Sequence, residues 1–219
     1  MRKTLQILSI SFTCLLLACS NATATPQPTV EAKEEASTTQ EDNTSEEKTL
    51  IVYFSRAGEN YGVGVVEKGN TQKVAEIMQE ETGYDIFRIE TVKEYPVSYD
   101  ETLEVATAER NNNERPELKT SIDNFDSYST IILGYPIWWG DMPMAVYTFL
   151  ESYDFSGKTI YPFVTHGGSG LAGTIQSIQE TVSNATVKDG LAIQGTMAQN
   201  NEDETRKLVQ DFLTKSELK

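Results

Sequence analysis

Cysteine and histidine are scarce in this chain, and their scarcity excludes several kinds of site. Of 219 residues, two are cysteine and one is histidine. Cys14 and Cys19 both lie near the N-terminus, so the rest of the chain has no disulfide and no thiol nucleophile. With His166 as the single imidazole, a histidine-based zinc cluster is excluded, and the carboxylates show no spacing typical of a metal site.

Positive charge is also in short supply. The chain carries 18 Lys and Arg against 33 Asp and Glu, for a formal net charge of −15 at pH 7. Such a protein lacks the cationic surface that binds the phosphates of nucleic acids, so nucleic acid is disfavoured as a partner. A basic protein or a small molecule fits this charge better.

The apolar stretch at the N-terminus is too short to predict a transmembrane helix. A basic start and an apolar run over residues 5–17 are typical of a secretory signal. The ending Leu16-Leu17-Ala18-Cys19 resembles a bacterial lipobox, which implies removal of residues 1–18 and lipidation of Cys19. Because two acyl chains anchor a protein stably, we expect an exported lipoprotein of the cell membrane, with its domain outside the cytoplasm. A plain secretory signal cut nearby is the alternative.

Two further regions follow this leader. Residues 19–48 begin with the lipidated cysteine and are rich in Thr, Ala, Glu, Ser and Pro, with almost no large apolar side chains. Such a composition cannot offset its ordering entropy by burial, so it predicts a flexible acidic tether. Residues 49–219 have the length of one domain.

The predicted domain alternates short apolar runs with helical patterns. Five strands are expected, and they span residues 50–54, 86–89, 130–134, 159–164 and 191–193. The fourth contains Pro162 and is therefore expected to end or become irregular there. Apolar residues at helical spacing predict helices after strands one, three, four and five, around residues 74–78, 146–150, 171–182 and 208–212. Residues 96–120 stay open between helix and loop. The alternation predicts an α/β fold with a doubly wound five-stranded parallel sheet in the order 2-1-3-4-5.

The loop after the first strand has the features of a phosphate site. It begins Ser55-Arg56-Ala57-Gly58 and resumes at Gly69-Asn70-Thr71, just before the first helix. Hydroxyls and backbone N–H groups at a helix start bind anions without a lysine. Residues 59–68 look like an insertion. A simple helix cap with a glycine-rich hairpin is the alternative, and neither a P-loop nor a dinucleotide fingerprint is present.

The loop after the third strand carries Pro136-Ile137-Trp138-Trp139-Gly140-Asp141. Strand ends are where open α/β sheets place their ligands, and two indoles there suit a flat aromatic molecule such as a flavin. Gly140 can turn its peptide so that its carbonyl accepts a hydrogen bond from the ring. The alternative is one core tryptophan and one surface tryptophan.

The loop after the fourth strand is Thr165-His166-Gly167-Gly168-Ser169-Gly170, whose small residues allow close approach of the backbone to a ring. A serine hydrolase is the competing interpretation of His166 and Ser169. It needs a Gly-x-Ser-x-Gly elbow, but Leu171 stands where the last glycine is required, and no later histidine exists. We therefore expect His166 to be a ring neighbour or a donor that fixes the loop.

Together these three loops resemble those of the flavodoxin-like family, in particular its group of bacterial lipoproteins and small FMN reductases. The resemblance implies one non-covalent FMN. Its phosphate would be held by Ser55, Arg56, Ala57, Asn70 and Thr71. Its ring would lie between two further sets of residues, Pro136, Ile137, Trp138, Trp139 and Gly140 on one side and Thr165, His166, Gly168, Ser169 and Gly170 on the other. The insertion departs from the short flavodoxin loop and leaves open which amides reach the phosphate.

The resemblance implies a tethered redox protein that transfers electrons at the cell surface to a partner protein or a small acceptor. The acidic surface is expected to disfavour an anionic reduced flavin. An electron carrier is favoured, and an FMN-dependent NAD(P)H reductase of quinones or similar acceptors is the alternative. A surface binding module without a cofactor is a third possibility, from another functional class.

Overall fold

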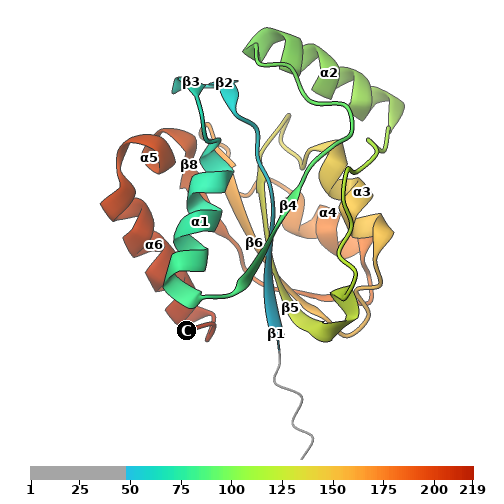
Figure 1. Ribbon diagram of the computed structural model, residues 1–219, viewed down its shortest axis with the longest axis vertical. Coiled ribbons are helices and arrows are strands. Elements are labelled where there is room, and N and C mark those ends of the chain that lie inside the picture. The colour runs from blue at the N-terminus through green and yellow to red at the C-terminus, as the bar shows by residue number, and fades with distance from the viewer. Residues whose placement is uncertain (1–47) are drawn as a thin grey trace, which may run out of the picture. The chain divides into compact units, whose positions relative to one another are not determined.

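A computed structural model describes residues 48–219, and the predicted signal peptide, Cys19 and nearly all of the tether lie outside these residues. The fold is a parallel sheet with helices on both sides (Figure 1). Its strands run in the order β4-β1-β5-β6-β7, with β8 beside β6 as well. The main strands are β1 (Lys48–Phe54), β4 (Asp85–Ile89), β5 (Tyr128–Pro136) and β6 (Thr159–His166). Numbered by position, this is the predicted 2-1-3-4-5 order, so the fold class is confirmed.

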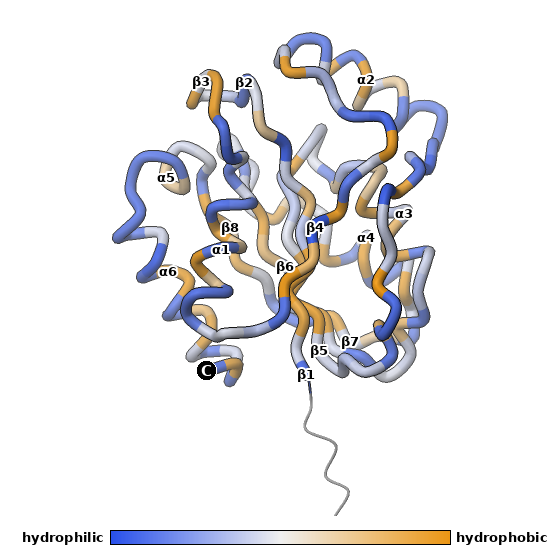
Figure 2. The backbone as a smooth tube through the Cα atoms, viewed as in Figure 1, coloured by the Kyte–Doolittle hydropathy of each residue, from blue (hydrophilic) through white to orange (hydrophobic). Residues whose placement is uncertain are grey.

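The central strands are buried on both faces, as their continuous apolar sequences predict. Along β1, Leu50, Val52 and Phe54 pack into one core, while Ile51 and Tyr53 pack into the other. The alternation follows from the two-residue period of a strand. Figure 2 shows hydrophobic residues concentrated in the strands at the centre of the fold.

Each core is closed by its own helices. On one face lie α3 (Met144–Ser152) and α4 (Thr174–Thr181), which supply Phe149 and Ile178 among others. On the other face lie α1 (Asn70–Thr82), α5 (Gly195–Asn200) and α6 (Glu202–Lys215), which supply residues such as Met78 and Val209. Among residues 48–219, no helix is both long enough and apolar enough to cross a bilayer.

The fifth position of the sheet differs from the expectation of one strand. It holds two short strands, β7 (Thr186–Val187) and β8 (Leu191–Gln194), both parallel to β6. Pro162 lies inside β6 rather than at its end, and its carbonyl faces Gly190 in the gap between β7 and β8. A proline has no N–H to donate, so the irregularity that it causes falls on the neighbouring strand position.

Three other elements refine the sequence-based prediction. The open region is helical as α2 (Tyr99–Asn112), whose N-terminal cap is the Ser98 hydroxyl accepting from the Glu101 N–H. A short 3-10 turn, η1 (Phe125–Ser127), precedes β5. The insertion forms an antiparallel hairpin of β2 (Gly58–Asn60) and β3 (Gly64–Val66), as the hairpin alternative in the sequence predicts.

One contact in the core leads to a stability prediction. Gly134 of β5 pairs with Phe163 of β6, and a Cβ at Gly134 would clash with the Phe163 ring. We expect Gly134→Ala to lower the free energy of unfolding by about 1–3 kcal/mol, because it overpacks this face. Denaturant unfolding of G134A, F163L and the double variant tests the cause. The loss of unfolding free energy caused by G134A should be smaller in the F163L background. An equal loss in both backgrounds would contradict a clash with the Phe163 ring as the cause.

Candidate functional site

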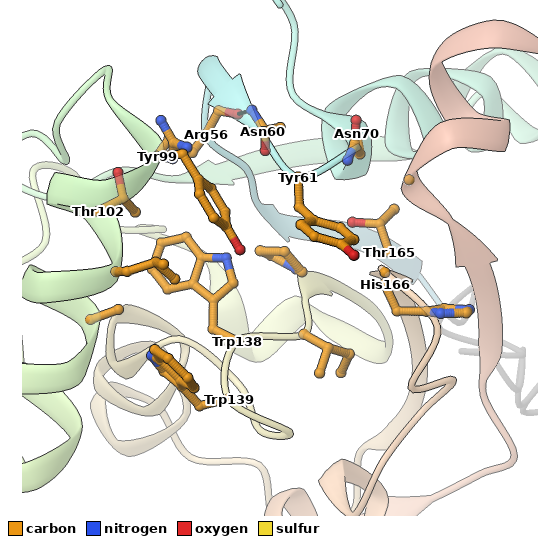
Figure 3. A pocket seen from close by; sticks show the side chains of 16 residues that line it. Arg56, Asn60, Tyr61, Asn70, Tyr99, Thr102, Trp138, Trp139, Thr165 and His166 are labelled. Carbon is orange, nitrogen blue, oxygen red and sulfur yellow. Dashed lines mark hydrogen bonds between the residues drawn. The ribbon is translucent and has the colours of Figure 1, made fainter. Parts of the chain in front are cut away.

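The carboxyl ends of β1, β5 and β6 open into a cavity of about 200 Å³ (Figure 3). The structure brings residues of all three predicted loops to its wall, namely Arg56, Asn70, Pro136, Ile137, Trp138, Trp139, Thr165 and His166. The other predicted residues lie in the same loops but outside this lining, namely Ser55, Ala57, Thr71, Gly140, Gly168, Ser169 and Gly170. The crevice at the switch point of the sheet is therefore the candidate site.

The two tryptophans are carried by a tight turn. The Trp138 N–H donates to the Asp141 carbonyl over 2.9 Å, and the Asp141 N–H donates back to Trp138 over 3.0 Å. Trp139 and Gly140 between them have φ of 54° and 77°. Positive φ at both central positions is the pattern of a type I′ turn, which is unusual for a residue as bulky as tryptophan. Asp141 fixes the far side of the turn, since its carboxylate accepts from the Tyr147 hydroxyl at 3.0 Å.

The environments of the two indoles differ. Trp138 packs edge-on against Phe54 and Tyr95, with ring centroids 5.6 and 5.2 Å away. Trp139 is 50% exposed. Both line the cavity. Trp138 contributes to the core as well as to the site, while Trp139 presents most of its free surface to the site and to solvent.

The first loop closes around the N-terminus of α1. Gly69 occupies the N-cap position, and the Ser55 hydroxyl accepts a hydrogen bond from the Gln72 N–H at 3.1 Å. The hydroxyls of Thr71 and Thr165 lie 2.7 Å apart and link the first loop to the third. A side chain on Gly69 would clash with the Arg56 carbonyl, so this close approach requires glycine. Buried hydroxyls thus gather at a helix end whose first N–H groups have no partner within the helix.

The hydrogen bonds of Arg56 differ from those expected of a side chain that binds phosphate. Its guanidinium donates to the carbonyls of Pro96 at 2.9 Å and Val97 at 3.1 Å, and also to those of Ala57 and Glu59. Burial lowers the pKa of this group from its ordinary value. Arg56 therefore ties the first loop to the segment before α2, with its donors directed at the backbone.

In the third loop, His166 contacts its own backbone neighbours. Its Nδ1 accepts a hydrogen bond from the Gly168 N–H at 2.9 Å, so the imidazole fixes the loop as an acceptor rather than as the predicted donor. Acceptance at Nδ1 requires that this nitrogen carry no proton. Burial lowers the pKa of His166, which favours the neutral form that this contact needs.

The sequence-based prediction missed one side of the cavity. Tyr61 of the hairpin and Tyr99, Thr102, Leu103 and Ala106 of α2 complete its wall. Only the helical apolar spacing around Leu103 and Ala106 hinted at a buried face there. Nothing local in the sequence places α2 or the hairpin over the strand ends, because long-range packing decides this.

The residues present fit a flavin on two observations. Aromatic rings and a proline line the cavity, which suits a planar ring. Asn70, at the start of α1, lies on the same wall, so an anion bound to the helix N-terminus would connect with a ring in the cavity. Gly195 packs against the Asn70 side chain, leaving no room for a Cβ, and Asn70 is also held by the Gln199 amide at 2.9 Å.

Comparisons with known proteins agree with this geometry. The sequence profile of the flavodoxin family matches residues 48–211. A provisionally named flavoprotein from Bacteroides eggerthii is 26% identical with a TM-score of 0.61, over 76% of this chain and 96% of that one. Another from Bacteroides uniformis is 26% identical with a TM-score of 0.60, over 75% and 98%.

A flavoprotein from Lactobacillus acidophilus, solved in complex with FMN, is 21% identical with a TM-score of 0.55, over 70% of this chain and 97% of that one. At this identity the likeness concerns the fold alone. A search of curated proteins finds no match to the chain.

The different packing of the two indoles predicts different costs of removal. Trp138→Ala should lower the free energy of unfolding by about 3 kcal/mol, because it leaves a cavity beside Phe54 and Tyr95. Trp139→Asn creates the Asn-Gly pair favoured in type I′ turns, and relief of roughly 1–2 kcal/mol of backbone strain offsets its lost contacts. Denaturant unfolding should show little net change for W139N, and equal losses in both variants would contradict this account.

The His166 contact predicts a pH dependence that a single-histidine protein allows to be measured directly. Because the folded pKa lies below the ordinary 6.5, the contact's stability is complete above pH 6.5 and is lost as pH falls through the folded pKa. An NMR titration should show one imidazole with a lowered pKa. The melting temperature of the native protein should exceed that of His166→Phe above pH 6.5. This difference should become smaller as the pH falls from 6.5 through the folded pKa. A raised pKa would contradict the acceptor role.

Proposed function

The chain belongs to the flavodoxin family, and on this premise we propose that it binds one FMN non-covalently in the cavity and transfers electrons. The bound flavin would supply the redox chemistry, while the protein binds and orients it and sets its electrostatic surroundings. The observation that carries the proposal is the cavity itself, where the tryptophan turn and the glycine-rich loop meet at the strand ends beside the start of α1.

Each loop has a role in this proposal. The N-terminus of α1 and the hydroxyls of Ser55 and Thr71 would hold the phosphate. Ser55 accepts from the Gln72 N–H, so its own hydroxyl proton stays available to donate. Trp138 and Trp139 would bind the ring, while the Thr165–His166 segment would lie at its other side.

The charge of the chain bears on the redox potential. A net charge of −15 disfavours the gain of negative charge by a bound flavin. The midpoint potential of the bound cofactor should therefore lie below that of free FMN.

Location is part of the proposal. The lipobox-like ending at Cys19 and the acidic segment that follows support a tether to the cell membrane, with the domain outside the cytoplasm. In that position the flavin would exchange electrons with a redox partner protein or a small acceptor near the membrane.

A reductase is the second candidate, and the α2 side of the cavity favours it. Leu103 and Ala106 extend the wall beyond the three loops assigned to the cofactor. A carrier needs only an exposed ring edge for its partner, whereas a reductase needs room for a small substrate beside the ring. Leu103 and Ala106 would line that room on the side away from the three loops.

Titration of the purified full-length protein with FMN tests the proposal. We expect quenched flavin fluorescence, a perturbed visible spectrum and a stoichiometry of one, because the ring would stack on indoles in a partly dry site. Riboflavin, which lacks the phosphate, serves as the control and should bind more weakly. If the fluorescence and spectrum of FMN stay unchanged, the proposal fails and the alternative of a surface binding module without a cofactor is favoured. Steady-state oxidation of NADH or NADPH by the loaded protein would favour the reductase over the carrier.

A further inference from the structure

The β2–β3 hairpin is fixed firmly at its base. The Glu59 N–H donates to the Val97 carbonyl over 2.8 Å, and the Glu59 carboxylate accepts from the Tyr99 N–H at 3.0 Å. The Arg56 guanidinium donates to the carbonyls of Val97 and Glu59, and so joins the same two segments from the other side. These bonds hold the hairpin against the start of α2, at the rim of the cavity.

The tip of the hairpin presents Tyr61 to the cavity. Its ring rests on Gly167, where a Cβ would lie only 2.9 Å from the Tyr61 Cδ1. The Tyr99 ring lies 6.2 Å from it, tilted by 39°. Figure 3 shows the Tyr61 ring between Trp138 and the side chains of Thr165 and His166. A ring from the insertion therefore bridges the site from the first loop to the third.

Tyr61 contributes little to the core for a residue of its size. It is 65% exposed. Gly62 and Gly64, both with φ of 74°, set the turn that carries it. A large exposed aromatic on a firmly anchored turn, facing an aromatic-lined cavity, is better suited to contacting a ligand than to stabilising the fold.

We propose that Tyr61 is a second aromatic wall of the ring-binding site, which stacks on the bound ring across from the tryptophan turn. This inference rests on the proposed binding of FMN. The Gly58–Lys68 insertion then has a function: it delivers a planar side chain to the side of the ring opposite the tryptophan turn. Gly167 is the residue against which the Tyr61 ring packs, because only a glycine lets the ring come this close to the third loop.

Four variants of the full-length protein test the role of Tyr61, with FMN affinity measured by fluorescence quenching. Tyr61→Ala removes the ring, and it should weaken FMN binding by about 2- to 12-fold, the range expected for one aromatic stack. Gly167→Ala displaces the ring without removing it and should weaken binding to a similar extent. In the double variant the second change should add almost nothing, because the two act through one contact. Val65→Ala, a 76%-exposed site on the same hairpin away from the cavity, is the control.

Iodide quenching of the bound flavin gives a second readout that does not depend on activity. The ring should be more accessible in Y61A and G167A than in the native protein, and unchanged in V65A. Tyr61→Phe keeps the planar ring and should restore affinity close to the native value. These results together would support stacking by the ring rather than a bond from its hydroxyl.

The possible failures are distinct. If the native protein does not bind FMN, the proposed function fails and this inference falls with it. If the native protein binds FMN but Y61A binds equally well, the inference alone is overturned. Tighter binding by Y61A would mean that Tyr61 fills the ring site as a plug, which also overturns it. If the losses of affinity in Y61A and G167A add up in the double variant, the loss in G167A comes from the backbone of the third loop and not from contact with Tyr61. That result would overturn the role given to Gly167.

Discussion

Burial of the central strands on both faces is the constraint on which the rest of the molecule depends. β1, β5 and β6 pair in parallel, and most of their side chains are buried in one of two cores. Parallel strands end at the same edge, so the three loops that follow them are forced together. The cavity exists because these loops must leave a tightly packed sheet at one place, and their small residues leave space between them.

Beside that space, the buried polar side chains are hydroxyls. The arginine predicted to face the phosphate donates to backbone carbonyls instead, and the buried hydroxyls of Ser55, Thr71 and Thr165 lie where the first and third loops meet. Backbone amides and hydroxyls suit an anion in an acidic protein because they bind it without adding a cation to the site. Arg56 serves the site indirectly, since it sets the position of the hairpin and of the start of α2.

The sequence predicted the elements whose signals are local. Continuous apolar runs identified β1, β4, β5, β6 and β8, and the lone Pro162 marked an irregularity at the fourth strand. The irregularity appears one strand away, because the missing N–H affects the neighbour that would have bonded to it. Trp138, Trp139 and the glycine-rich loop were recognisable as candidate site residues by their chemistry and their place after strands.

Residues whose role comes from long-range packing were not predictable. Tyr99 and Ala106 belong to a helix that lines the cavity only because the chain folds back over the strand ends. Tyr95 meets both the Glu109 carboxylate, at 2.8 Å, and the ring of Trp138. Burial raises the pKa of Glu109, and no sequence pattern around it indicates burial. The positive φ of Trp139 is equally invisible in sequence, because bulky residues rarely adopt it.

The backbone of that turn has a consequence for how it can respond to a ligand. Rotating the Trp139–Gly140 peptide would require a type II′ geometry, whose first central position needs glycine, so the Cβ of Trp139 forbids it. Rotating the Gly140–Asp141 peptide is sterically allowed, because aspartate tolerates a left-handed backbone. It would break the Asp141 N–H bond to Trp138 and disturb the carboxylate that holds Tyr147. The turn thus has one immovable amide and one that can reorient, and any reorientation would be transmitted to the first turn of α3.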